Sequence, residues 1–260
     1  MNHIQQFQAL HHADEMLFLG NAWDVLSART LEQSGFRAIG TTSWGVAASL
    51  GYKDGENIDF ALHLSIIKLI VDHVNIPVSA DIEAGYAETH GQIVENVLRT
   101  ADLGVAGINI EDSFKRGPGL KEIADQAKLL QTMRAALDNR GFAAFYINTR
   151  IDTYFRREDP FAETIERGLA YVESGASGIF VPGIVEEEQI RAIAQAVRAP
   201  LNVLSRPTLT NAERLAEWGV KRLSIGNDFY DHVADFAKAS ASKLAADRDT
   251  ALLYAANRQG

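Results

Sequence analysis

Short apolar runs recur along the chain at regular intervals, and segments with helical periodicity separate them. Eight such runs are predicted as strands: residues 17–19, 37–39, 77–80, 107–110, 144–148, 178–181, 201–204 and 222–225. Between them, residues 60–73 and 93–103 have the pattern of amphipathic helices, and in the first of these the apolar positions predicted to share one face are Leu62, Ile66, Ile67, Leu69 and Ile70. This alternation of strand and helix is typical of parallel strands joined by crossover helices.

The predicted helices end in a repeated signal, a glycine placed just before the next strand. Gly35, Gly104, Gly175 and Gly219 all occupy such a position, which fits a left-handed helix C-cap. Because no linker or composition shift interrupts the repeat, we predict a single (β/α)₈ barrel domain spanning residues 1–260. The Ala-rich segment 226–257 is predicted helical and is longer than a barrel helix requires, so we expect it to reach a neighbouring subunit.

Composition narrows the classes of protein that this barrel represents. With 260 residues, 47% of them hydrophobic, the chain can form a large core without cross-links, and it contains no cysteine. Its 25 basic and 34 acidic residues give a net charge of −9, which disfavours nucleic acid and membrane surfaces as partners. Neither a signal-peptide pattern nor a long apolar span is present, so a cytoplasmic location is expected.

Carboxylates follow several of the predicted strands, where barrel enzymes carry their catalytic groups. Asp81 and Glu83 follow the third strand with strand alternation, Glu111 follows the fourth, and Asp54 lies in the loop after the second. Acids brought together at one rim repel each other unless a cation offsets the charge. An oxygen-preferring ion fits this requirement, so we predict an Mg²⁺ site at Asp81, Glu83, Glu111 and Asp54, with Mn²⁺ as the alternative ion.

Arg150 follows the fifth strand and is predicted to bind a substrate carboxylate. The same residues also allow structural interpretations: Arg150 could form a rim ion pair with Asp152 or Glu111, and Asp54 could only shape a turn. The histidines show no metal-ligand spacing, and we expect most of them to be solvated. Trp44 and Tyr86 are candidates for lining the pocket, although barrel aromatics commonly serve packing.

These residues, taken together, resemble the isocitrate lyase and phosphoenolpyruvate mutase superfamily. The resemblance rests on residues 21–24 (Asn-Ala-Trp-Asp), 41–45 (Thr-Thr-Ser-Trp-Gly), 50–56, 77–86 and 104–112, and on Arg150. It implies a (β/α)₈ barrel, an Mg²⁺ site, a homo-oligomer (a tetramer or dimer) with exchanged C-terminal helices, and 2-oxo acid or enolate chemistry.

The resemblance also implies individual roles. Asp81 is similar to the direct Mg²⁺ ligand, while Glu83, Glu111 and Asp54 are similar to acids that hold the ion through water. Glu83 replaces the commoner aspartate, and its longer side chain could bind the ion directly. The resemblance also implies substrate contacts. Trp23, beside Asp24, would form a wall of the pocket, and the other contacts would come from Ser43, Trp44, Gly45, Asp81 and Arg150.

The loop after the fourth strand departs from the family pattern. Lyases of the family carry a Lys-Lys-Cys-Gly-His motif there, whereas this chain has Ser-Phe-Lys-Arg-Gly-Pro-Gly-Leu-Lys at 113–121 and no cysteine. We therefore predict an Mg²⁺-dependent lyase or decarboxylase that acts on an oxaloacetate-like 2-oxo carboxylate through a metal-stabilised enolate, with Asp54, Glu111 and Arg150 as catalytic residues. Lys115, Arg116 or Lys121 is expected to close over the leaving group. The alternatives are phosphonopyruvate or phosphoenolpyruvate chemistry at a C–P bond, and a catalytically silent barrel that binds a metabolite.

Overall fold

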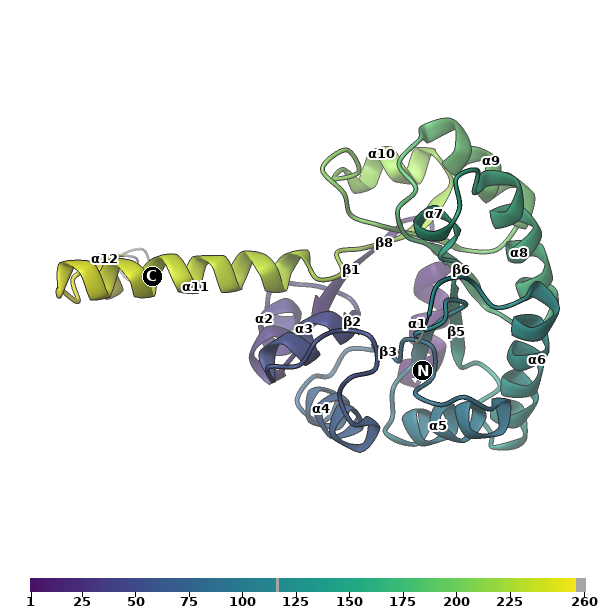
Figure 1. Ribbon diagram of the computed structural model, residues 1–260, viewed down its shortest axis with the longest axis horizontal. Helices are drawn as coiled ribbons and strands as arrows, with labels where there is room; N and C mark the ends of the chain where they lie inside the picture. Colours follow the sequence, from purple (N-terminus) through teal and green to yellow (C-terminus); the bar gives the residue numbers. More distant parts are fainter. Residues whose placement is uncertain (116, 256–260) are drawn as a thin grey trace.

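Eight parallel strands close into a barrel in chain order, as the computed structural model of residues 1–115 and 117–255 shows (Figure 1). Closure occurs where β1 pairs with both β2 and β8. The strands are β1 Leu17–Ala22, β2 Ile39–Thr41, β3 Val78–Asp81, β4 Gly107–Glu111, β5 Tyr146–Arg150, β6 Gly178–Val181, β7 Leu201–Leu204 and β8 Val220–Ser224. The predicted barrel is confirmed, and all eight predicted runs contribute a strand.

Helices surround the barrel, apart from the last two, which extend away from it (Figure 1). They are α1 His3–His11, α2 Val25–Gln33, α3 Ser43–Ser49, α4 Phe60–Asp72, α5 His90–Asp102, α6 Ile123–Asn139, α7 Thr153–Arg156, α8 Phe161–Glu173, α9 Glu187–Val197, α10 Ala212–Glu217, α11 Asp228–Asp247 and α12 Leu252–Ala255. Side-chain oxygens of Asn2, Asp24 and Asp59 cap α1, α2 and α4, which satisfies amide groups that a helix start leaves unpaired. The C-cap glycines Gly35 and Gly104 have φ of 94° and 92°, as predicted.

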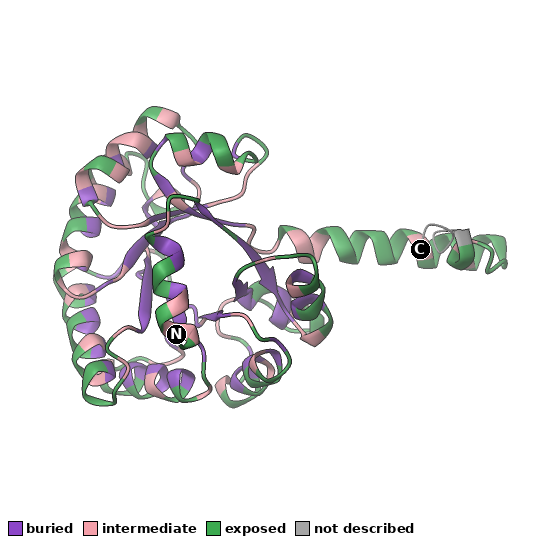
Figure 2. Cartoon of the chain, turned by 180° about the vertical axis from the view of Figure 1, so that it is seen from behind, coloured by how far each residue is buried: buried purple, intermediate pink, exposed green. Residues whose placement is uncertain are grey.

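Most residues of the barrel strands are buried on both faces of the sheet, whereas the helices also carry exposed residues (Figure 2). Outward apolar side chains such as Ile108 and Ile147 pack under the helices, while α1 places Phe7 and Leu10 against Leu19 at the amino end of the barrel. One predicted helix face is wrong. In α4, Leu62 and Leu69 are 36% and 47% exposed, and the buried positions are His63, Leu64, Ile67 and Ile70. The prediction used only the apolar residues, and it placed the buried face wrongly because a polar residue, His63, forms part of that face.

The C-terminal segment packs on the barrel only at its start, where Phe229 and Tyr230 contact Trp23, and then projects away from it (Figure 1). No residue of α11 is buried, and Phe236 is 72% exposed. The long C-terminal helical extension predicted over 226–257 is confirmed in α11, and it is interrupted, since α11 ends at Asp247 and Arg248 adopts a left-handed φ of 51° before α12. Residues 256 and 257 lie outside the described part of the chain. Among the described helices, none combines the length and apolar character needed to cross a bilayer.

Candidate active site

A cavity of about 300 Å³ opens at the carboxyl ends of the strands. Its walls come from most of the strand ends and following loops: Asn21, Thr41, Thr42, Ser43, Trp44, Asp54, Asp81, Asn109, Arg150, Phe155, Phe180, Pro182, Leu204, Arg206, Ser224, Gly226 and Asn227. Five predicted site residues, Ser43, Trp44, Asp54, Asp81 and Arg150, are therefore brought to one cavity. Glu83 and Glu111 lie beside it and are connected to it through Asp81 and Arg150.

Ser43 links the acids of two loops. Its Oγ donates to Asp81 Oδ2 at 2.8 Å and lies 3.4 Å from Asp54 Oδ1, while its backbone N–H also points at Asp81, 3.3 Å away. Asp81 is held from behind, because its own N–H donates to Thr41 Oγ1 and its carbonyl oxygen lies 2.9 Å from His63 Nε2. The second carboxylate oxygen of Asp81, Oδ1, has only a distant donor, the N–H of Glu83 at 3.5 Å, and Asp81 lines the cavity.

Glu83 is fixed by a reciprocal arrangement with Glu56. The backbone N–H of Glu56 donates to both oxygens of Glu83 at 3.1 Å, and Tyr86 Oη donates to Glu83 at 2.8 Å. In return, the carboxylate of Glu56 accepts from the N–H groups of Ala84 and Tyr86. Glu56, Glu83 and Tyr86 all have φ between 51° and 58°, a conformation costly for these residues that persists only because the surrounding contacts hold it.

Glu111 and Glu83 share a lysine. Lys115 Nζ lies 2.6 Å from Glu111 Oε1 and 2.9 Å from Glu83 Oε2, and its side chain is only 15% exposed. Arg150 Nη1 lies 3.1 Å from the other oxygen of Glu111, and Arg150 Nε donates to Asp152 at 2.6 Å. The structural interpretation of Arg150 as a rim ion pair is correct, and Arg150 also lines the cavity.

The charges of this cluster are unevenly compensated. Burial raises the pKa of Glu111, but Arg150 and Lys115 outweigh it and lower the pKa overall. Asp81 and Asp54 have less compensation: burial raises the pKa of Asp81, and burial together with the charge of Glu83 raises that of Asp54 to about 6. Arg150 lowers the pKa of Asp81 and Lys115 lowers that of Asp54, but for both acids burial outweighs the nearby cation.

A divalent cation fits this donor set at its cavity side. Mg²⁺ prefers a few carboxylate oxygens together with water, and Asp81 and Asp54 offer oxygens toward the cavity with charge left to neutralise. Glu83 and Glu111 already interact with Lys115. Across the described residues, no group of three or more His, Asp or Glu side chains stands ready to enclose a metal, so direct coordination by the whole set remains a prediction.

Other predicted substrate contacts lie elsewhere. Trp23 is buried against Phe229 and Tyr230 and does not line the cavity, and Asp24 caps α2. The N–H of Gly45 donates to Thr42 Oγ1 at 3.2 Å, and a Cβ on Gly45 would lie 2.8 Å from the Thr42 methyl group. Gly45 thus serves the close packing of α3, while Trp44 lines the cavity and is 47% exposed.

The loop after β4 forms a small hairpin beside the acids. Ser113 and Leu120 pair as an antiparallel bridge, and Asp112 anchors the base by accepting from Arg167 and Tyr171. Of the three cations expected to close over a leaving group, Lys115 reaches the acid cluster. Lys121 is buried and its Nζ has no hydrogen-bond partner among the described residues, whereas Arg116 lies outside them.

A buried polar network below the cavity was missed from the sequence. Arg222 donates to Ser224 Oγ at 3.0 Å and lies 3.4 Å from Asn109 Oδ1, while Asn148 donates to that same oxygen and Ser224 donates to Asn202. Barrel interiors are usually filled by branched apolar residues. The available signal was the polar residue at every second position of a strand, such as Asn109 before Glu111 and Asn148 before Arg150.

Two histidines also differ from expectation. Most of the histidines were expected to be solvated, whereas His11 and His63 are 1% and 0% exposed. His63 supports Asp81 from α4, and His11 stacks on Tyr146 with ring centroids 3.8 Å apart. Histidine inside an apolar helix face was the available signal for His63.

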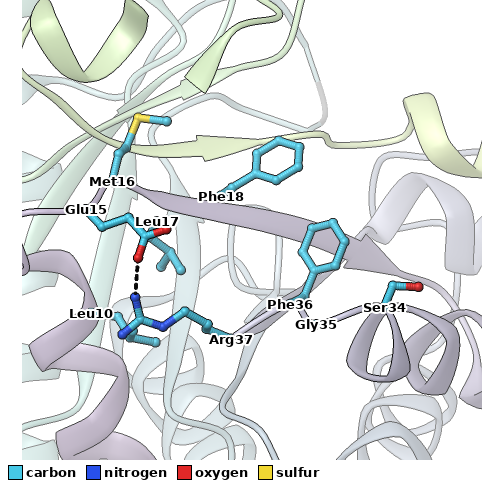
Figure 3. A pocket seen from close by; sticks show the side chains of 9 residues that line it. All are labelled: Leu10, Glu15, Met16, Leu17, Phe18, Ser34, Gly35, Phe36 and Arg37. Atoms are coloured by element: carbon cyan, nitrogen blue, oxygen red, sulfur yellow. Dashed lines mark hydrogen bonds and ion pairs between the residues drawn. The ribbon is translucent and has the colours of Figure 1, made fainter. Parts of the chain in front are cut away.

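A second cavity, of about 380 Å³, lies away from the acids at the amino end of β1 (Figure 3). Phe18 and Phe36 stack at its edge, and an exposed ion pair between Glu15 and Arg37 borders it. Its one acid and one base are paired with each other, so this cavity lacks the cluster of carboxylates that lines the cavity at the opposite end of the strands.

Clustered carboxylates and an arginine lie at the carboxyl ends of the parallel strands. These features define the class of protein as a (β/α)₈ barrel with an enzyme-like anion site. Residues 7–245 match the family model described as phosphoenolpyruvate phosphomutase. The chain belongs to this family, within the phosphoenolpyruvate mutase and isocitrate lyase superfamily, whose members are enzymes.

Relatives with different activities are similar to the chain. An uncharacterised Mycobacterium tuberculosis protein is 36% identical over 93% of this chain and 89% of its own length. The oxaloacetate decarboxylase of Pseudomonas fluorescens SBW25 is 30% identical over 88% of this chain and 78% of its own. A Burkholderia cenocepacia structure, provisionally named a phosphonomutase, is 36% identical with a TM-score of 0.88, covering 92% of this chain and 99% of that one. A phosphonopyruvate hydrolase solved with oxalate and Mg²⁺ is 23% identical with a TM-score of 0.86, covering 95% and 88%, and shares the fold.

Proposed function

We propose that this protein is an Mg²⁺-dependent lyase that decarboxylates a small 2-oxo dicarboxylate of the oxaloacetate type. One observation carries the proposal: Arg150 and the incompletely compensated acid Asp81 face the same cavity. An anionic substrate and a divalent cation would each meet an opposite charge there. The similarity to an oxaloacetate decarboxylase supports this choice of substrate.

The residues present fit the roles that this reaction needs. Arg150 binds and orients a substrate carboxylate through its guanidinium, which Glu111 and Asp152 hold in place. Ser43 Oγ donates its proton to Asp81 and lies 3.4 Å from Asp54, so it orients both carboxylates at the cavity. The enclosing walls, including Phe180 and Leu204, reduce access of water to the reacting atoms.

Asp81 and Asp54 would hold the cation on the cavity side, with Glu83 and Glu111 acting on it through water. When bound, the cation supplies Lewis-acid stabilisation of the charge that develops on the 2-oxo oxygen. The bond between C3 and its carboxylate breaks, CO₂ leaves, its bonding electrons form the enolate of pyruvate, and a proton then replaces CO₂ at C3. The reaction needs no thiol, in agreement with a chain that has no cysteine.

Cleavage of a C–P bond is the second candidate function, because the family model and the Burkholderia protein are both named for that chemistry. A silent barrel is disfavoured by the acids themselves, since carboxylates whose burial is only partly compensated reduce stability and need a reason to be kept. We also propose that the protein is cytoplasmic and that the exposed α11 joins copies of this chain into a dimer or tetramer.

The test supplies purified protein and Mg²⁺ with oxaloacetate, phosphonopyruvate or 2-methylisocitrate and follows pyruvate, together with phosphate for the second substrate. We expect turnover of oxaloacetate. Because Mg²⁺ alone decarboxylates oxaloacetate, the rate measured with the Arg150→Gln variant at equal concentration is subtracted as background. Phosphate release from phosphonopyruvate would favour the second candidate function. If none of the three compounds were turned over, the silent barrel would be favoured. If Asp81→Ala bound Mg²⁺ as tightly as the wild type in calorimetry, the metal assignment would be wrong.

A further inference from the structure

A second arginine, Arg206, lines the same cavity as Arg150 and was not predicted from the sequence. Arg206 lies in the loop after β7, whereas Arg150 ends β5. Both guanidinium groups lie over the ring of Phe155, with their central carbons 5.8 and 5.9 Å from its centroid. Two cations therefore share one aromatic ring at one cavity.

The two arginines differ in their partners. Arg150 pairs with Glu111 and Asp152, but none of the carboxylates in the described part of the chain lies within ion-pair distance of Arg206. Asp228 is near enough for Arg206 to oppose the burial that raises its pKa, yet no ion pair joins them. A half-buried guanidinium with an open charge binds an anion more strongly than a solvated one, because less water must be displaced.

The loop holds Arg206 in place. Its carbonyl oxygen accepts from the N–H of Leu209 at 2.8 Å, and Leu209 is 2% exposed. The ring of Phe155 is fixed in turn by Gly183, where a Cβ would lie 2.7 Å from the ring. The backbone of Arg206 and the ring that its guanidinium contacts are thus held before any ligand arrives, which lowers the entropy cost of binding.

We propose that Arg206 binds the distal carboxylate of the substrate and so determines specificity for dicarboxylates. The inference rests on the proposed function only in placing the substrate in this cavity. With Arg150 on one carboxylate and Arg206 on the other, a four-carbon diacid is bound at both ends. A monocarboxylate would leave Arg206 without a partner.

The test compares malate with lactate, two stable 2-hydroxy acids that differ by the distal carboxylate. Dissociation constants are measured by calorimetry with Mg²⁺ present, for the wild type and for Arg206→Gln and Arg206→Lys. The wild type should bind malate about 10- to 100-fold more tightly than lactate, the range for a charge-assisted contact. Arg206→Gln should abolish this preference, and Arg206→Lys should retain part of it.

Arg214→Gln is the matched control, since Arg214 also lies over an aromatic ring, Trp218 at 5.0 Å, but does not line the cavity. It should leave the malate preference unchanged. Because the readout is a ratio within one variant, partial unfolding lowers both affinities without mimicking the effect. An unchanged preference in Arg206→Gln, or a wild type without preference, overturns the inference. Loss of the preference in a protein that does not decarboxylate oxaloacetate upholds it while rejecting the proposed reaction.

Discussion

Lys115 places its ammonium nitrogen 2.6 Å from the carboxylate of Glu111, so the chain itself supplies a cation to the innermost acid of the site. The same nitrogen lies 2.9 Å from Glu83. Lys115 and a divalent cation therefore act on the same group of negative charges, and the stability of the protein becomes sensitive to both.

Replacing Lys115 with Met should reveal this sensitivity. Removal of one partner from a buried ion pair costs about 3–5 kcal/mol. In Lys115→Met, Glu83 and Glu111 each lose a counter-charge, and only Glu111 keeps another, Arg150. We expect the metal-free variant to unfold at lower temperature than the wild type and to gain more stability from added Mg²⁺. Thermal unfolding followed by circular dichroism, with and without Mg²⁺, measures both effects.

Lys68→Met provides the control, because Lys68 pairs with Asp72 on the exposed side of α4, with half of each side chain in water. Its loss should change stability by less than about 0.5 kcal/mol, with no dependence on Mg²⁺. Equal Mg²⁺ responses in wild type and Lys115→Met would contradict the shared use of these acids.

His11 predicts a pH dependence of stability. Burial, and then the charge of Arg222, lower its pKa from 6.5 to about 3, and Nε2 has no partner among the described residues. Between these values the unfolded chain binds a proton that the folded chain does not, so stability falls as the pH decreases from 6.5. The slope from this group approaches about 1.4 kcal/mol per pH unit.

The measurement is urea unfolding of wild type and His11→Phe at several pH values from 4 to 8, taken as the difference between the two proteins. Phenylalanine keeps a ring to stack on Tyr146 but cannot bind a proton. The wild type should lose stability relative to the variant only below about pH 6.5. A constant difference over the whole range would refute the buried neutral histidine.

Arg222 predicts that one isosteric change stabilises the barrel. It is fully buried, and no acid of the described chain forms an ion pair with it. Asn202 is its cross-strand neighbour, and both residues bond to Ser224. Asn202→Asp would give Arg222 a counter-charge. A hydrogen bond to a charged group contributes about 1.5–3 kcal/mol, and the burial of the new carboxylate offsets part of this gain.

Asn148→Asp is the matched comparison. Asn148 donates to Asn109 Oδ1 at 2.8 Å, so an acid there would face another acceptor and should destabilise the fold. If the denaturation midpoints of both variants moved in the same direction, Arg222 would not control whether a new carboxylate stabilises or destabilises the barrel.

Gly178 should be intolerant of any side chain. A Cβ there would lie 2.3 Å from Tyr146 Oη and 2.8 Å from the carbonyl oxygen of Pro200, inside the barrel. We expect Gly178→Ala to cost about 1–3 kcal/mol, measured by urea denaturation. Gly91→Ala, on α5 with no neighbouring atom within 4 Å, should instead lie within about 1 kcal/mol of wild type.

The order of elements and the rim acids were predictable because both leave a local pattern. Apolar runs, C-cap glycines and carboxylates after strands identify the barrel and place Asp81 and Arg150 at the correct end of it. Element ends were less predictable: β2 and β5 each begin two residues later than expected, since hydrogen bonding to neighbouring strands, not apolar character, sets where pairing starts.

By itself, therefore, the sequence determined the (β/α)₈ fold, the acidic rim and the absence of a thiol. Only the tertiary structure decided that Lys115 reaches Glu111, that Arg222 lies beneath the cavity and that Arg206 joins Arg150 over Phe155. The second and third of these relationships join residues on different strands and loops, so no spacing along the chain encodes them. Lys115 is only four residues from Glu111, but the fold of the loop after β4 decides that their side chains meet. Their partners are chosen when closure of the barrel brings the loops to one rim and removes the charges from water.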